Sequence, residues 1–444
     1  MKTFKFQTSR LMAMLTLVML LAVTQLVHAE IHGITGPSFT LTASAANIDT
    51  PDGDSVLMWG YGVTGSPFGM QYPGPTLIVN QGETVNITLT NSLSTSVSMV
   101  FPGQTGVTST GGSAGLLTNE AAPSGSVTYQ FTATNAGTYM YHSGTDPQLQ
   151  IEMGLVGALI VRPPQANQAY SHADTAYDQE YLFLLTALDL DIHLAIEQGR
   201  PQDIDNTAYN SVHWFINGRN GPDTMSPPNL PWQPHQPYNA LARTHPGDKV
   251  LIRVIGASRE THPFHTHGNH FFQIARDGRL LESTPGAGPD RQRGDFTLQT
   301  VPGATYDALW EWTGENLGWD IYGTPAEGGT AHTCIDNLPG PPAGPDGFDD
   351  TTHEYCADHG KTLGGTIGVS LPENQDLTFG GFYSGSPFLG VSADLPPGEG
   401  GLNVNGGLFF MWHSHNAKEQ VNNDLFPGGM TTMMVIEPPG VAIP

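Results

Sequence analysis

Two short segments of the chain each carry a pair of histidines separated by one residue. The first holds His265 and His267, and the second holds His413 and His415. Both segments are otherwise rich in apolar residues, and on a strand residues i and i+2 point to the same face. Two such strands side by side would present four imidazoles to one cavity. Imidazole is a good ligand for copper and zinc, so the two pairs favour a metal site over isolated core or surface histidines.

At these residues the chain resembles the multicopper oxidases. Residues 262–268 read His-Pro-x-His-x-His-Gly, which resembles the third copper motif of that family. Residues 410–415, running on to Met430, resemble the fourth motif, and residues 139–143 resemble the second motif and include His142. The resemblance implies an all-β fold with two cupredoxin-like Greek-key β-sandwich domains, and copper held by histidines.

One departure from the fourth motif concerns the electron-entry copper, which the family calls type 1. The family has a cysteine between the two histidines, whereas this chain has Ser414. A neutral hydroxyl cannot replace a thiolate as a soft ligand. His262 matches one type 1 histidine, the second falls near Glu419, and Met430 matches the axial ligand. We therefore expect no type 1 copper.

The histidines of the three-copper cluster are also fewer than in the family. The first motif aligns with residues 100–103, which hold no histidine, and Gly144 replaces the second histidine of the second motif. The family roles would give His142 and His415 to one type 3 copper, His267 and His413 to the other, and His265 to the type 2 copper. This set could support one or two copper ions. The predicted metal ligands are His142, His265, His267, His413 and His415.

The position of the motifs resembles the two-domain branch of the family, in which trimers place the metal site between domain 1 of one subunit and domain 2 of the next. The resemblance therefore implies a possible homotrimer, with His142 contributed by a neighbouring chain. A long insertion in the second domain could reshape that interface.

Short alternating strands separated by Gly/Pro turns recur along the chain and predict two domains. Residues 84–91 and 249–254 each follow a Gly-acidic pair and form an alternating strand, a weak internal repeat of one fold. The predicted organisation is a signal peptide at 1–29, a first domain at 30–165 and a second at 166–444. The second contains a Gly/Pro/Asp-rich insertion at about 323–400.

The N-terminus has the pattern of a secretory signal peptide. Lys2, Lys5 and Arg10 precede an apolar run over residues 11–27, and Ala29 ends a small-residue cleavage site. We expect a periplasmic or secreted protein with no stable membrane insertion after the signal is removed. Sixteen Lys and Arg against 41 Asp and Glu give a formal charge of −25, which argues against nucleic-acid partners.

The chain contains two cysteines, Cys334 and Cys356. In an exported chain they predict a disulfide, with a pair of thiolate metal ligands as the alternative. His332, His353 and His359 flank them and could form a second metal site or be scattered surface histidines.

Three functions remain open from the sequence. The first is a copper-dependent oxidoreductase, not a normal laccase, that works without type 1 copper. The second is a protein that stores or buffers copper, and the third is a metal-free cupredoxin scaffold that binds other proteins. Retention of every cluster histidine in the second domain favours metal binding, while no residue pattern identifies the substrate.

Overall fold

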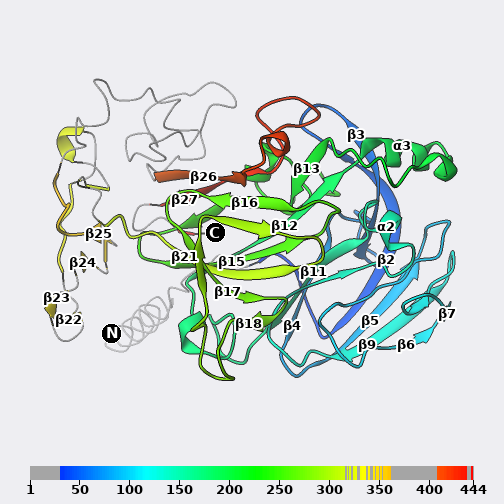
Figure 1. The fold of residues 1–444 in the computed structure, drawn as a ribbon, viewed down its shortest axis with the longest axis horizontal. Coiled ribbons are helices and arrows are strands. Elements are labelled where there is room, and N and C mark those ends of the chain that lie inside the picture. The colour runs from blue at the N-terminus through cyan, green and yellow to red at the C-terminus, as the bar shows by residue number, and fades with distance from the viewer. Residues whose placement is uncertain are drawn as a thin grey trace, which may run out of the picture.

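The computed structural model describes residues 31–361, with short gaps between residues 316 and 353, together with residues 408–437 and 442–443. The predicted signal peptide and residues 362–400 of the predicted insertion lie outside the described residues. The fold is all-β and consists of two cupredoxin-like sandwiches, as predicted (Figure 1). In the part of the chain described, no helix combines the length and apolar character needed to span a membrane.

The first sandwich is built from two mixed sheets whose inward-facing residues alternate with outward-facing ones. One sheet has the order β1 (Ile34–Thr35), β4 (Gly74–Asn80), β11 (Val156–Arg162), β10 (Gly137–His142). The other has the order β3 (Ser55–Val63), β2 (Ser38–Asp49), β5 (Thr84–Asn91), β9 (Ser126–Thr132), β6 (Thr108–Gly111). A small hairpin of β7 (Ser113–Ala114) and β8 (Asn119–Glu120) and the short helix α2 (Pro147–Gln150) complete it.

The second sandwich also has two sheets. One has the order β13 (His213–Ile216), β12 (Gln179–Leu188), β15 (Lys249–Gly256), β21 (Thr305–Glu311), β17 (Phe271–Arg276), β18 (Arg279–Leu280), with β19 (Arg293–Asp295) also beside β17. The other, which carries the histidine pairs, has the order β14 (Ala242–Thr244), β27 (Thr431–Ile436), β26 (Leu408–Ser414), β16 (His262–Thr266), β20 (Thr297–Thr300).

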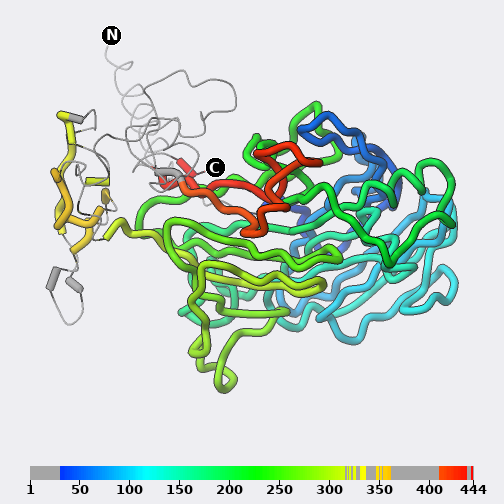
Figure 2. Tube along the Cα trace, turned by 45° about the horizontal axis from the view of Figure 1, so that its top comes forward, coloured from blue at the N-terminus to red at the C-terminus, as the bar shows by residue number. Residues whose placement is uncertain are grey.

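The remaining described elements are short, apart from one helix of two turns. They are α3 (Leu190–Glu197), the 3-10 turns η1 (Ala173–Thr175), η2 (Pro201–Asp203), η3 (Asp223–Met225), η4 (Pro325–Glu327) and η6 (Ala417–Gln420), and the two-residue strand pairs β22 (Pro339–Gly340) with β23 (Gly344–Pro345) and β24 (Phe348–Asp349) with β25 (Glu354–Tyr355). The β22–β25 segment lies beyond the second sandwich, on the side away from the first, in both views (Figures 1 and 2).

The two sandwiches repeat one pattern of strand pairing. In the first, β5 pairs parallel with β2 and antiparallel with β9; in the second, β15 pairs parallel with β12 and antiparallel with β21. The predicted repeat between residues 84–91 and 249–254 therefore lies on equivalent strands, β5 and β15. In the other sheets, the antiparallel pair β10–β11 beside parallel β4 matches β26–β27 beside parallel β14.

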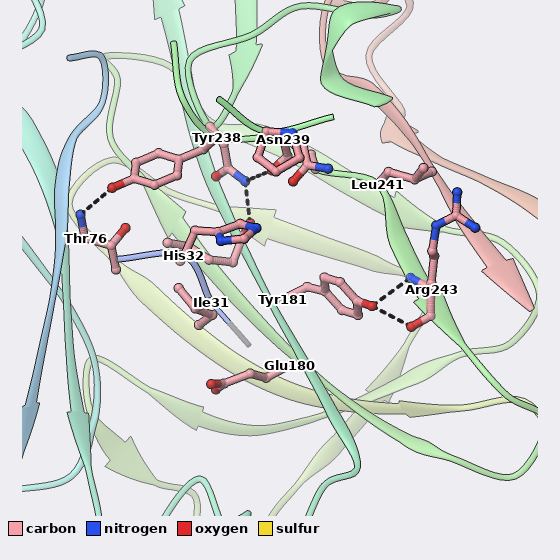
Figure 3. A pocket seen from close by; sticks show the side chains of 13 residues that line it. Ile31, His32, Thr76, Glu180, Tyr181, Tyr238, Asn239, Leu241 and Arg243 are labelled. Atoms are coloured by element: carbon pink, nitrogen blue, oxygen red, sulfur yellow. Dashed lines mark hydrogen bonds between the residues drawn. The ribbon is translucent and has the colours of Figure 1, made fainter. Parts of the chain in front are cut away.

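The domains meet through packed apolar side chains and a buried polar network. Met140 and Ala158 of the first sandwich pack with Leu184 and Ile255 of the second. A small cavity of about 190 Å³ at the boundary is lined by residues of both domains (Figure 3). At its wall the Thr76 amide donates to the Tyr238 hydroxyl at 2.9 Å, so polar groups there tie the two domains together.

The centre of the polar network is Arg253, which is fully buried on β15. Its Nε donates to Glu180 Oε2 at 3.0 Å, and its Nη1 donates to Thr138 Oγ1 of the first sandwich at 2.9 Å. Thr138 in turn donates to Asp307 at 2.5 Å. Burial opposes ionisation of Glu180, but Arg253 and Arg162 outweigh it and hold the pKa of Glu180 below its usual value. The network therefore keeps two buried carboxylates neutralised across the domain boundary.

Replacing Arg253 by Met should destabilise the protein by about 3–5 kcal/mol, because Asp307 would stay buried without its cation and Glu180 would keep only Arg162. Urea unfolding followed by tryptophan fluorescence measures the loss. The control is Lys249→Met, which removes an exposed cation at the start of the same strand and should change stability by no more than about 0.5 kcal/mol. Equal losses in the two variants would contradict the role of the network.

Candidate metal centre

The four histidines of the second domain are collected by one antiparallel strand pair. β16 and β26 are neighbours, and their register sets His265 directly opposite His413. Side chains at such positions lie close together, and the next residues on the same face are their diagonal neighbours. His267 lies diagonal to His413, and His415 lies diagonal to His265. The two histidine pairs, each with i, i+2 spacing, therefore form one group of four imidazoles on the same face of the strand pair.

The group lies on the outer face of its sheet. The intervening residues Phe264, Thr266 and Trp412 are buried and point the other way, into the sandwich. His265 and His267 are partly exposed, His415 is exposed, and His413 is buried. The histidine cluster, meaning His265, His267, His413 and His415, is thus supported from behind by the core and open on its outer side.

Three of the imidazoles lie close enough to share one ion. One ring nitrogen from each of His265, His267 and His413 lies within 4.8 Å of the others. The Nε2 atoms of His267 and His413 are 3.2 Å apart. A tetrahedral ion with Zn-like bonds of about 2.0–2.1 Å holds two ligand atoms about 3.3 Å apart. His415 does not belong to this closest group, but its ring is centred 4.7 Å from that of His265.

Hydrogen bonds to the Nδ1 atoms fix the orientation of two of these rings. His413 Nδ1 bonds to the carbonyl of the next residue, Ser414, at 2.7 Å. His265 Nδ1 bonds to the Thr297 hydroxyl of β20 at 2.7 Å. A bond at one ring nitrogen leaves the other available to a metal and sets its direction. In both rings the available nitrogen is Nε2.

The environment favours the neutral form of His265 and His413. Burial lowers the pKa of His265 to about 4, and repulsion from His267 and His415 adds to the effect. Burial, together with repulsion from its neighbouring histidines, likewise lowers the pKa of His413 to about 4, against the opposing bond to Ser414. Neutral imidazole is the form that binds metals. The donor set consists of imidazoles, two of which are neutral and have a directed Nε2, and it fits copper.

Gly268 shapes the end of the third motif. It has a φ of +92°, and a Cβ there would lie 3.0 Å from Phe410 and 3.1 Å from Trp310. Glycine is the residue that adopts this conformation without strain. The chain can therefore turn sharply after His267 and keep that ring beside His413.

His142 ends β10 of the first sandwich and does not belong to a metal-ligand group with the other histidines among the described residues of one chain. Its Nδ1 bonds to the carbonyl of Ser143 at 2.8 Å, which repeats the His413–Ser414 arrangement on the equivalent strand. Burial lowers its pKa, so it too is a neutral imidazole with Nε2 available. The backbone of Val100, from the histidine-free first motif, pairs with it.

The position of the type 1 copper lies on the inner face of the same strand pair. His262 is fully buried, and its Nδ1 contacts Glu419 Oε2 at 3.0 Å while its Nε2 contacts the Ser258 hydroxyl at 2.6 Å. Ser414 is also buried, and its amide donates to the Met430 carbonyl at 2.9 Å, which ties the strand end to the Met430 turn. The position holds an imidazole–carboxylate pair and no thiolate. Its residues therefore do not fit a type 1 copper.

Two supporting residues were not predicted from the sequence. Thr297 orients His265 from β20, and Ser258 closes the far side of His262. Neither lies in a recognisable motif, because each acts only through strand pairing or a loop contact. Met99 and Met140, which lie close in sequence to the depleted motifs, are buried in hydrophobic clusters and have packing roles.

Comparison with known proteins gives a match in the first domain. Residues 63–166 match the multicopper oxidase family model. L-ascorbate oxidase of Cucumis sativus is 36% identical over 119 residues, which cover 26% of this chain and 19% of that protein. The iron transport multicopper oxidase FET3 of Saccharomyces cerevisiae is 42% identical over 96 residues, covering 21% of this chain and 15% of that protein. The chain thus spans about a fifth or less of the length of these relatives.

The family model matches the first domain, which contributes only His142 to the predicted metal ligands. The two motifs with paired histidines lie in the second domain. Among solved structures, the blue copper oxidase from Nitrosomonas europaea superposes with a TM-score of 0.53 at 18% identity, covering 89% of this chain and 85% of that one. This likeness shows the fold. The first domain is therefore similar in sequence to the multicopper oxidases, and the two sandwiches together are similar in fold to the blue copper oxidase.

Proposed function

We propose that this chain is an exported copper-binding protein that holds one or two copper ions at the histidine cluster and performs redox chemistry without type 1 copper. The observation that carries the proposal is the convergence of four imidazoles on one strand pair, with two of them oriented through Nδ1. Export is supported by the N-terminal pattern and by the Cys334–Cys356 disulfide, which is typical of oxidising compartments.

Copper bound at such a site supplies one-electron redox chemistry. The protein contributes the neutral imidazoles, their orientation and the open outer face. In the family a cysteine between the two fourth-motif histidines links the inner and outer faces of this strand, and here that residue is Ser414. A reductant must therefore approach the outer face directly, which favours small substrates that fit against the exposed His415.

The proposal includes a homotrimer in which a second subunit completes the site. In that arrangement His142 of one chain faces the open histidine cluster of the next. Two observations support it: the cluster is open on its outer side, and His142 has the same Nδ1 bond as His413 on the equivalent strand. His142 would then add a fifth imidazole to the proposed site.

Copper storage or buffering is a second candidate, and the inner face of the strand pair favours it. The buried His262–Glu419 pair occupies the position through which electrons would otherwise enter. A protein that binds copper and has no electron entry can hold the ion without turnover. Oxidase assays with small reductants distinguish this candidate from the first.

The mature protein, purified from copper-supplied cells, should contain one or two copper ions per chain. Replacing both His265 and His413 by Ala should remove them, because these residues form the central cross-strand pair of the cluster. Elemental analysis with electron paramagnetic resonance provides the count. The matched control is His270→Ala, since His270 lies in the same segment but packs against Phe272 and Phe296.

The proposal is overturned if the folded parent protein contains no copper and takes up none when copper is added. The metal-free scaffold would then be the remaining function. Copper that remains bound in the His265→Ala/His413→Ala variant would show that the copper site lies elsewhere in the chain.

Replacing Ser414 by Cys should not create a blue copper site. A thiolate would be present, but Glu419 would still stand where the second imidazole is needed, bound to His262. Visible absorption of the copper-loaded variant tests this, with Ser414→Cys/Glu419→His as the comparison that supplies both missing ligands. The intense band of a copper–thiolate bond in the single variant would contradict the expectation.

Subunit mixing tests the position of His142. The His142→Ala and His413→Ala variants should each lose copper when expressed alone. When the two are co-expressed, random assembly into symmetric trimers should restore about one quarter of the intersubunit sites, since each such site needs one intact domain from each variant. Recovery of no copper, in trimers that contain both variants, would contradict a site shared between subunits. Copper retained by the His142→Ala variant alone would exclude His142 from the site.

A further inference from the structure

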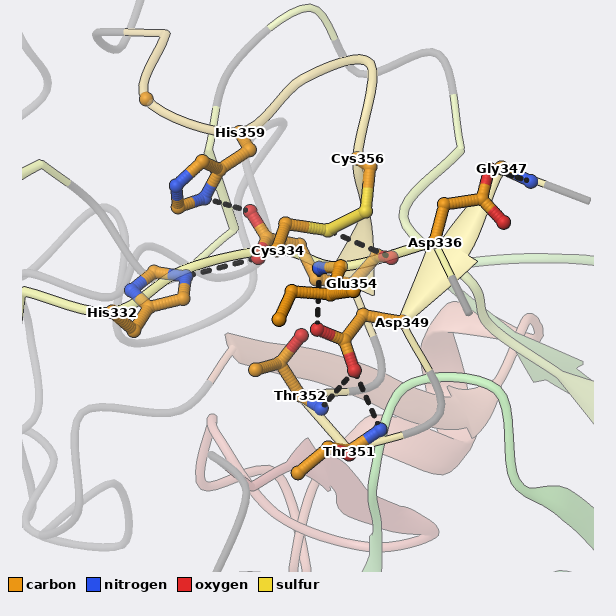
Figure 4. The surroundings of a disulfide bond; sticks show 12 residues. His332, Cys334, Asp336, Gly347, Asp349, Thr351, Thr352, Glu354, Cys356 and His359 are labelled. Carbon is orange, nitrogen blue, oxygen red and sulfur yellow. Dashed lines mark hydrogen bonds and ion pairs between the residues drawn. A yellow bond between two sulfur atoms is a disulfide. The ribbon is translucent and has the colours of Figure 1, made fainter. Parts of the chain in front are cut away.

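A second group of metal-ligand side chains lies around the β22–β25 segment, outside the copper motifs. It consists of Asp320, His332, Glu354 and His359, and one ligand atom from each lies within 4.8 Å of every other. Figure 4 shows His332 and His359 pointing at the same carboxylate, that of Glu354, beside the Cys334–Cys356 disulfide. The sequence left open whether these histidines form a site, and it did not indicate the two acidic residues. The third flanking histidine, His353, lies outside the described residues.

The carboxylate of Glu354 lies at the centre of the group. Its Oε2 is 2.9 Å from His332 Nε2, and its Oε1 is 2.9 Å from His359 Nδ1. Asp320 Oδ2 is 3.5 Å from the same His359 nitrogen. These separations are close to the roughly 3.3 Å that a tetrahedral ion with bonds of about 2.0–2.1 Å imposes on its ligand atoms.

Burial and charge also favour a cation here. Glu354 and Asp320 are only 1% and 2% exposed. Two carboxylates buried this close together need positive charge to offset their desolvation and mutual repulsion. A divalent ion would neutralise both while the imidazoles remained neutral.

The chemistry of the donors selects the ion. Imidazole and carboxylate together suit zinc, whereas calcium and magnesium prefer oxygen ligands alone. Both cysteine sulfurs are committed to the disulfide and cannot act as thiolate ligands. Four protein ligands leave no open position, which is typical of structural zinc sites and not of catalytic ones.

The local chain holds the ligands in place. The disulfide joins positions two residues after His332 and two residues after Glu354, so it brings together the segments that carry them. The amide of Gly360 donates to Asp320 Oδ2 at 2.8 Å, and the amide of Asp320 donates to the Lys361 carbonyl at 2.9 Å. These bonds set Asp320 beside His359.

We propose that Asp320, His332, Glu354 and His359 form a structural zinc site that, with the Cys334–Cys356 disulfide, stabilises the segment beyond the second sandwich. Segments with little apolar core commonly depend on disulfides or metals in this way. The site is separate from the histidine cluster and shares no residue with it.

Zinc titration of the copper-loaded mature protein tests the proposal. Calorimetry should show one Zn²⁺ bound per chain, and Zn²⁺ should raise the melting temperature, because an ion that binds only the folded state stabilises it. In the His332→Ala/His359→Ala variant the affinity should fall by more than about 100-fold, since loss of a supporting residue alone costs about 10–100-fold. The matched control is His172→Ala, whose side chain is 28% exposed, against 29% for His359.

A second variant, Glu354→Gln, removes the central carboxylate with little change of shape and tests the site if the double variant does not fold. It should also lose zinc affinity while retaining copper. The proposal is overturned if the parent protein binds no zinc, or if either folded variant binds zinc as tightly as the parent does. Hydrogen bonds between the histidines and the carboxylates would then account for the clustering of these four side chains. Loss of zinc affinity in these two variants tests this site whether or not copper binds at His265 and His413.

Discussion

The antiparallel pairing of β16 with β26 is the constraint on which the proposed chemistry depends. Once the register sets His265 opposite His413, the alternation of side chains sends each remaining residue of the two strands to a defined face. A shift by one residue would bury the histidines and expose Phe264 and Trp412. The aromatic core of the second sandwich therefore fixes the metal-binding face as much as the histidines themselves do.

The same alternation places two groups of histidine side chains on opposite faces of one strand pair. The outer face retains its imidazoles, while the inner face has His262 bonded to Glu419 where the family has a copper–thiolate centre. Ser414 lies between His413 and His415 and joins the two faces through the backbone. Two residues, Ser414 and Glu419, stand where the family pattern has the cysteine and the second histidine, so replacing one of them is not expected to create that centre.

Much of this arrangement could be predicted from the sequence. The all-β class and the disulfide follow from local patterns, and the cupredoxin-like type of the sandwiches follows from the family resemblance. Strand periodicity alone put His265 with His267 and His413 with His415. Other features could not be predicted, because they depend on contacts between distant segments. Thr297 reaches His265 only through pairing of β20 with β16. Asp320 and Glu354 meet the histidines beside the disulfide from separate parts of an irregular segment, with no periodic pattern to reveal it.

The bonds from His142 and His413 to the carbonyl of the following serine have a consequence for how such proteins change over evolutionary time. Each ring is aimed by its own stretch of backbone, without help from another histidine. Mutation of another histidine therefore leaves the orientation of these two rings unchanged. A lineage can lose histidines one at a time through intermediates that still fold. The remaining histidines then keep their orientation in a smaller metal site.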